Sequence, residues 1–171
     1  MGIVKEFNVV WLSLTYNCNN NCVWCYSASN RKSRYEKSLI SDYENELTSF
    51  LSDLKVKRVI LIGGEPTLYK GLLKLINNLS KEGIIVGMVS NGRRLKDYSF
   101  CEGLKENGLN SVGISIEGYD QQSHEAITQA KGSYEETIKG VRIVNKLGLR
   151  LSTNTVIGRC NINNLEKIVK A

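Results

Sequence analysis

The chain has 171 residues, 42% of them hydrophobic, which suits one globular domain with a sizeable core. A complete eight-fold β/α barrel needs roughly 250 residues, so the length excludes one. The formal net charge is +6, but no long run of Lys or Arg is present, which argues against a nucleic-acid partner. No apolar run approaches the ~18 residues of a membrane span and no signal peptide is visible, so we expect a cytoplasmic protein without a membrane partner. Five cysteines, an odd number, argue against a disulfide framework.

Hydrophobic periodicity predicts strands that alternate with helices along the whole chain. The strands are expected over residues 8–15, 56–62, 84–89, 111–117 and 149–157. Residues 26–37 are polar and are expected to form a loop. Apolar residues at helical spacing predict five helices, which begin at a Ser41–Glu44 capping box, near Leu72, near Leu95, at a Ser133–Glu136 capping box and near Asn163.

This alternation predicts an α/β fold with a parallel sheet of about five β/α units, curled into a partial, TIM-like barrel. The last predicted helix has no C-cap signal before Ala171. We therefore expect residues 1–171 to form one core domain that is truncated at its C-terminus.

Three cysteines follow the first predicted strand at a CxxxCxxC spacing, as Cys18, Cys22 and Cys25. A four-iron cluster normally takes four thiolates, so three ligands would leave one iron with an open coordination position. A zinc site would need a fourth nitrogen or sulfur ligand, and the single histidine, His124, falls on a predicted loop far along the chain. The spacing favours a catalytic iron–sulfur site, with a zinc-stabilised interaction module as the alternative.

Unusual residues also follow each of the other predicted strands. Active sites of parallel β/α proteins lie at the carboxyl ends of the strands, so these residues are expected to share one rim with the cysteines. They are Gly63-Gly64-Glu65-Pro66-Thr67, Ser90-Asn91-Gly92, Glu117 and Gly158-Arg159-Cys160.

The CxxxCxWC motif, joined to Gly63-Gly64-Glu65-Pro66, resembles the radical S-adenosylmethionine (SAM) enzyme family over residues 10–164. The stretches 115–118 and 124–134 are similar to its peptide-modifying, SPASM-type branch. The resemblance implies that Cys18, Cys22 and Cys25 hold a [4Fe–4S] cluster and that SAM chelates the fourth iron. It also implies an external one-electron donor, flavodoxin- or ferredoxin-like, and reductive cleavage of SAM to a 5′-deoxyadenosyl radical.

The same resemblance implies a set of contacts to SAM. Trp24 would lie beside the adenine, and Glu65 with the backbone of Gly63 and Gly64 would meet the methionine amine. The remaining polar contacts would come from the later strands and the loops after them, namely Asn91, Ser115, Glu117, Asn154 and Arg159. No general base is expected for the first step.

A peptide or protein is the favoured substrate, and three alternatives stay open: a small molecule, an RNA, or a truncated domain that binds SAM or a partner without turnover. The chain departs from the family pattern in having five β/α units where six are usual. Several other residues have plainer expected roles. Trp11 and Cys101 are expected in the core, Cys160 as an unpaired thiol, His124 at a cap or on the surface, and Arg93, Arg94 and Lys96 on a solvated face.

Overall fold

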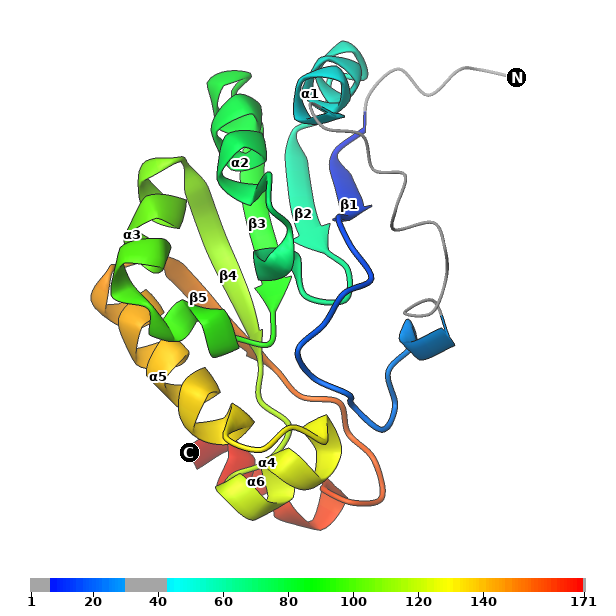
Figure 1. The fold of residues 1–171 in the computed structure, drawn as a ribbon, viewed down its shortest axis with the longest axis vertical. Helices are drawn as coiled ribbons and strands as arrows, with labels where there is room; N and C mark the ends of the chain where they lie inside the picture. Colours follow the sequence, from blue (N-terminus) through cyan, green and yellow to red (C-terminus); the bar gives the residue numbers. More distant parts are fainter. Residues whose placement is uncertain (1–6, 30–42, 171) are drawn as a thin grey trace.

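The computed structural model describes residues 7–29 and 43–170, which form a five-stranded parallel sheet with helices between the strands (Figure 1). The strands pair in sequence order. They are β1 (Val9–Ser13), β2 (Arg58–Ile62), β3 (Ile85–Ser90), β4 (Leu109–Ser115) and β5 (Arg150–Asn154). The predicted α/β architecture is confirmed.

Six α-helices and several short 3₁₀ helices lie between and after the strands within the described residues. The α-helices are α1 (Tyr43–Asp53), α2 (Leu72–Lys81), α3 (Tyr98–Glu106), α4 (Gln121–Thr128), α5 (Ser133–Lys146) and α6 (Leu165–Lys170). The 3₁₀ helices include η3 (Pro66–Leu68), η4 (Arg93–Lys96) and η5 (Ile162–Asn164). None of the helices in this part of the chain is long and apolar enough to cross a membrane.

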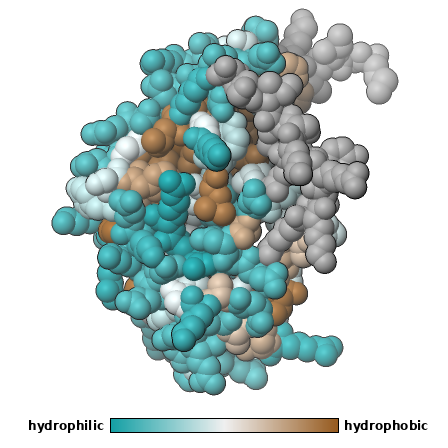
Figure 2. Space-filling view, viewed as in Figure 1, coloured by the Kyte–Doolittle hydropathy of each residue, from teal (hydrophilic) through white to brown (hydrophobic). Residues whose placement is uncertain are grey.

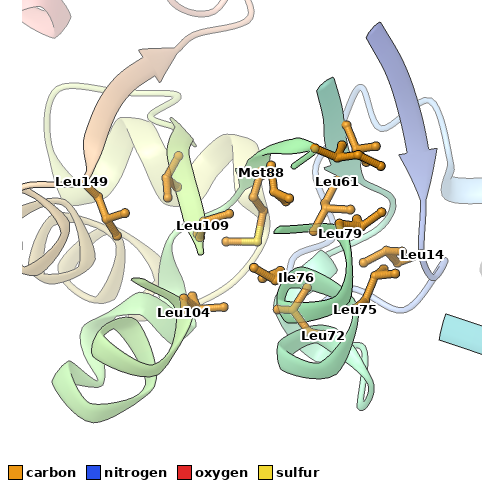
Figure 3. Packing of buried hydrophobic residues seen from close by; sticks show 14 of the residues in the cluster. Leu14, Leu61, Leu72, Leu75, Ile76, Leu79, Met88, Leu104, Leu109 and Leu149 are labelled. Carbon is orange, nitrogen blue, oxygen red and sulfur yellow. The ribbon is translucent and has the colours of Figure 1, made fainter. Parts of the chain in front are cut away.

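One face of the sheet carries the hydrophobic core because side chains alternate between the two faces of each strand. Leu61 of β2 and Met88 of β3 pack against α2, whose Leu75 and Ile76 point toward the strands (Figure 3). In the space-filling view, hydrophobic side chains gather in the middle of the visible face and hydrophilic ones surround them (Figure 2). The core therefore fixes the strands from one side and leaves their other face for the site.

Trp11 was expected in the core, and this prediction is wrong. Its side chain is 62% exposed because it lies on the face of β1 opposite Leu12, which packs against the core. Cys101 is fully buried on α3 as expected, and its thiol donates to the carbonyl of Leu95 at 3.1 Å. Burial raises the pKa of the Cys101 thiol to about 12, so it is an inert core group.

Helix α4 was not predicted, since residues 121–128 contain few apolar side chains. It begins with a capping box of a different kind, in which Asp120 accepts from the Ser123 amide and the Ser123 hydroxyl accepts from the Asp120 amide. The expected helix from Leu95 is divided, because Asp97 caps α3 after the short η4 segment. Ser41 and Asp42, which belong to the predicted first capping box, lie outside the described residues.

The predicted capping box at Ser133 and Glu136 is also wrong. Gly132 is the N-cap of α5, and the Ser133 hydroxyl lies 2.7 Å from that of Thr128. The buried stripe of α5 consists of small residues, among them Thr137 and Gly140. A Cβ on Gly140 would lie 2.3 Å from the carbonyl oxygen of Gly92, so the helix backbone approaches the β3–α3 connection closely.

Candidate functional site

A cavity of about 430 Å³ opens at the carboxyl ends of β1 to β4. Its volume lies within the range of small-molecule and cofactor pockets. Ten of the twelve predicted site residues line it, namely Cys18, Cys22, Trp24, Cys25, Gly63, Gly64, Glu65, Asn91, Ser115 and Glu117. The structure thus brings together side chains that are up to about a hundred residues apart in the sequence.

The cysteine loop, residues 18–25, follows β1 and lies beside α4 (Figure 1). All three of its thiols are partly buried. The Cys18 sulfur accepts a hydrogen bond from the amide of Asn20 at 3.4 Å, and the Cys25 sulfur lies 3.3 Å from the Ser27 hydroxyl. Hydrogen bonds to sulfur are one of the means by which a protein tunes an iron–sulfur cluster.

Helix α4 supports the second half of this loop through its last carbonyl groups. The amide of Asn21 donates to the carbonyl of Thr128 at 2.8 Å, and the amide of Val23 donates to that of Ile127 at 3.0 Å. The carbonyls at a helix C-terminus have no partner within the helix, so they are available for such bonds. Helix α4, which the sequence did not predict, therefore holds part of the candidate cluster site in place.

The Gly63–Gly64 turn brings the end of β2 against the segment that leads into the cysteine loop. The amide of Gly64 donates to the carbonyl of Thr15 at 2.6 Å, and that of Glu65 donates to Asn17 at 2.7 Å. A Cβ on Gly64 would lie 2.4 Å from the Asn17 carbonyl oxygen, and Gly63 has a φ of 145°. Only glycine allows this approach, which holds the two loops of the cavity together.

Glu65 is the most strongly held acid of the cavity, with a side chain that is 1% exposed. Its carboxylate accepts hydrogen bonds from the amide and hydroxyl of Thr67, the hydroxyl of Ser90 and the amide of Asn91, at 2.7–3.1 Å. Burial raises its pKa, and these hydrogen bonds act in the opposite direction. Glu65 thus joins the end of β3, at Ser90 and Asn91, to the glycine turn after β2. Its expected contact with the methionine amine stays a prediction.

Glu117 follows β4 and is also buried, at 5% exposed. Its carboxylate accepts a hydrogen bond from the amide of Val156 at 3.1 Å, and burial raises its pKa. Because Glu117 lines the cavity, it can accept a hydrogen bond from a bound ligand. Ser115, two residues earlier on the same strand, lines the cavity as well.

His124 was expected at a cap or on the surface, and this prediction is wrong. Its side chain is 1% exposed in α4, where Nδ1 accepts the backbone N–H of Glu117 at 3.2 Å. The imidazole meets the ring of Tyr134 edge to face. Burial lowers the pKa of His124 to about 4, so the ring is neutral and can serve as this acceptor.

Two of the predicted SAM contacts do not line the cavity. Asn154 is exposed at the end of β5, and its amide nitrogen lies 2.9 Å from the position that a Cβ on Gly113 would occupy. Arg159 is exposed in the turn that follows β5. Their roles toward SAM stay predictions. Cys160 is exposed and free in the same turn, and its sulfur lies 3.9 Å from the position that a Cβ on Gly158 would occupy.

Further residues line the cavity without having been predicted. The sequence could have indicated three of them. Tyr26 and Ser27 directly follow the cysteine loop, and Ser90 begins the Ser90-Asn91-Gly92 stretch that was expected at the same edge of the sheet. Thr128 had no signal in the sequence, since it belongs to the unpredicted α4. The complete set of additional lining residues is Trp11, Asn20, Tyr26, Ser27, Ile62, Val89, Ser90, Thr128 and Val156.

The residues present fit a [4Fe–4S] cluster with SAM. Three thiols on one wall match a cluster with one iron left open, and close to them lies a glycine turn with no side chain to fill the space. Across residues 7–29 and 43–170, no three His, Cys, Asp or Glu side chains are grouped to hold a single metal ion. The cavity also offers a hydrogen-bonding wall at Ser115 and Glu117.

Curated relatives match nearly the whole chain. It is 31% identical over 173 residues to a GTP 3′,8-cyclase of Peptoclostridium acidaminophilum, covering 98% of this chain and 52% of that protein. It is 34% identical over 161 residues to a probable GTP 3′,8-cyclase of Sulfurisphaera tokodaii, covering 92% and 50% respectively. The chain thus spans about half the length of the curated relatives it matches.

Solved structures share the fold at lower identity. The anSMEcpe structure with bound AdoMet (SAM) aligns with a TM-score of 0.79 at 19% identity, covering 96% of this chain and 48% of that one. Streptococcus suis SuiB bound to its precursor peptide SuiA aligns with a TM-score of 0.79 at 20% identity, covering 97% and 36%. The partial-barrel fold is therefore confirmed.

The profile of the Radical SAM superfamily matches residues 12–171, which is nearly the whole chain. The match includes both the cysteine motif and the glycine turn that the structure brings together around one cavity. The chain therefore belongs to the radical SAM superfamily, whose enzymes use a [4Fe–4S] cluster and SAM as cofactors.

Proposed function

We propose that this chain is the catalytic core of a radical SAM enzyme and that Cys18, Cys22 and Cys25 are its cluster ligands. The observation that carries the proposal is the meeting of these three thiols with Gly63, Gly64 and Glu65 around one cavity. When bound, the cluster supplies the electron that cleaves the sulfonium C–S bond of SAM, which yields methionine and a 5′-deoxyadenosyl radical that takes a hydrogen atom from the substrate.

The residues of the chain bind and orient in this proposal. Trp24 offers a flat apolar surface for the adenine, and Glu117 offers a carboxylate for hydroxyl groups. The backbone of the Gly63–Gly64 turn lies close enough to the cysteine loop to meet a ligand there, because no side chain intervenes. A flavodoxin- or ferredoxin-like protein is the proposed electron donor.

The test is anaerobic reconstitution with iron and sulfide, followed by SAM and dithionite. We expect about four irons per chain and conversion of SAM into 5′-deoxyadenosine. Cys22→Ala should lose the cluster and the product, whereas Cys160→Ala, a matched loss of an exposed thiol, should keep both. A Cys22→Ala protein that retains its cluster would contradict the ligand assignment.

We propose a small molecule, with GTP as the first compound to test, in place of the peptide that the sequence alone favoured. The support is the name of the relatives at 30–34% identity, GTP 3′,8-cyclase, whereas structures named with peptide partners are 18–20% identical. With fully deuterated GTP, we expect deuterium in the 5′-deoxyadenosine, detected by mass spectrometry. Turnover of SAM without such transfer would exclude GTP and return the peptide to first place.

A non-catalytic core is the competing proposal, since the relatives are about twice as long as this chain. It predicts a bound cluster and bound SAM without 5′-deoxyadenosine. Fusing the corresponding C-terminal half of a relative to this chain should then restore the product. The core-domain organisation of residues 1–171 stays a prediction.

A further inference from the structure

Arg93 connects three parts of the chain that are far apart in the sequence. It lies in η4, between β3 and α3, with a side chain that is 15% exposed. Its Nε donates to the carboxylate of Glu136 on α5 at 2.6 Å. Its Nη1 donates to the side-chain oxygen of Asn20 at 3.0 Å and to the backbone carbonyl of Asn19. One guanidinium therefore joins the cysteine loop to α5.

The geometry of these contacts requires an arginine. A guanidinium carries five N–H donors in a rigid plane, whereas a lysine presents one compact charge on a flexible stem. Asn20 is 5% exposed, so its hydrogen bond from Arg93 is shielded from water, which strengthens it. Lys96 also contacts Glu136 but is bonded to no residue of the loop among the described contacts. The solvated face expected for Arg93 is therefore not observed.

Asn91 adds a second connection to the same half of the loop. Its amide nitrogen donates to the side-chain oxygen of Asn19 at 2.6 Å and lies 3.8 Å from the Cys18 sulfur. The backbone amide of Arg93 donates to the Asn91 side-chain oxygen at 3.1 Å, which orients that amide. Arg93 thus acts on the Cys18 side of the loop directly and through Asn91.

The two halves of the cysteine loop are held differently. Asn21 and Val23 bond through their backbone to α4, so substituting their side chains leaves these bonds in place. Asn19 and Asn20 are held by the side chains of Arg93 and Asn91. Residues 19–20, between the first two cysteines, are therefore held in part by a charged side chain that lies outside the CxxxCxWC and GGEP motifs.

We propose that Arg93 is a positioning residue for the cluster, which holds residues 19–20 in the geometry that receives it and places a positive charge beside it. This rests on the proposed function, because the charge matters only if a cluster binds between these cysteines. A nearby cation favours the more negative, reduced cluster and raises its reduction potential. The Glu136 carboxylate offsets part of this charge, but it pairs with Lys96 as well, so the three groups together keep a net positive charge. The Arg93 side chain is mostly buried, so salt screens its charge less than it would an exposed one.

The test compares Arg93→Met, Arg93→Lys and the matched control Lys96→Met with the parent chain. In the cluster-free proteins, hydrogen–deuterium exchange of the amides of Asn19 and Asn20 should be at least about fivefold faster in Arg93→Met, while the amides of Asn21 and Val23, which bond to α4, should exchange as in the parent. After reconstitution, an EPR-monitored titration should show the reduction equilibrium shifted about tenfold toward the oxidised cluster, which is 59 mV for one electron. Lys96→Met should match the parent in both measurements.

The lysine variant separates charge from geometry. Arg93→Lys should recover most of the parent potential, while its loop amides still exchange faster than those of the parent. Parent-like exchange and potential in Arg93→Met would overturn the proposal, and so would faster exchange without any change in potential, which would make Arg93 a structural brace only. A parent chain that binds no cluster would instead overturn the proposed function.

Discussion

Glu65 and Glu117 are both buried, both follow a strand and both line the same cavity, yet their surroundings differ. Glu65 accepts four hydrogen bonds from its own loop and the next one. Within the described residues, the carboxylate of Glu117 accepts one, from Val156. Glu65, after β2, is thus occupied in holding the loops of the cavity together, whereas Glu117, after β4, keeps acceptor capacity for a ligand.

The largest effect on stability should come from removing the carboxylate of Glu65. Glu65→Ala leaves four donors without their acceptor, and we expect a loss of at least about 3 kcal/mol in the free energy of unfolding. Urea unfolding of the cluster-free protein under reducing conditions measures it. Glu117→Ala should cost clearly less, and equal losses for the two variants would remove the distinction between the acids.

The second prediction concerns His124, whose neutral ring accepts the backbone N–H of Glu117. Its effect on stability should depend on pH. The unfolded imidazole takes up a proton near pH 6.5, whereas burial keeps the folded ring neutral down to a pKa of about 4. The unfolded state therefore binds more protons in this window, and the parent should lose on the order of 2 kcal/mol of stability as the pH falls from 6.5 to 4.

In His124→Phe this loss should be absent, although the variant starts from a lower stability because the Glu117 amide has lost its acceptor. Urea unfolding at several pH values measures both curves. A His124→Phe curve parallel to that of the parent would mean that the folded imidazole titrates normally.

The smallest expected effect is that of Glu117 on the affinity for SAM. Glu117→Gln keeps the shape of the side chain but removes its charge, and we expect SAM to bind about tenfold more weakly, or about 1.4 kcal/mol. Anaerobic isothermal titration calorimetry on the reconstituted protein measures this affinity. Glu166→Gln, on the exposed α6, is the matched control and should bind as the parent does. An unchanged affinity in Glu117→Gln would make both acids structural.

Much of the site was predictable because its key residues are close in sequence and have few alternative uses. Three thiols within eight residues and a Gly-Gly-Glu turn after a buried strand indicated the cavity without any tertiary information. The strand–helix alternation then placed both at one end of the sheet.

The rest depends on contacts that sequence periodicity does not encode. Helix α4 lacks an apolar stripe, since only His124, Ile127 and Thr128 of its eight residues are buried. Glu136 matched a capping box, but its carboxylate is drawn to Arg93 and Lys96. In each case a tertiary partner outweighs a local preference.

The close approach of Gly140 to the Gly92 carbonyl reaches beyond the packing of α5. A single methyl group at position 140 would push the helix away from the connection that carries Asn91 and Arg93. The displacement would be passed to the cysteine loop through the bonds of those two side chains. A buried helix position that touches neither sulfur nor cavity is thus coupled to the geometry of the loop that carries the three cysteines.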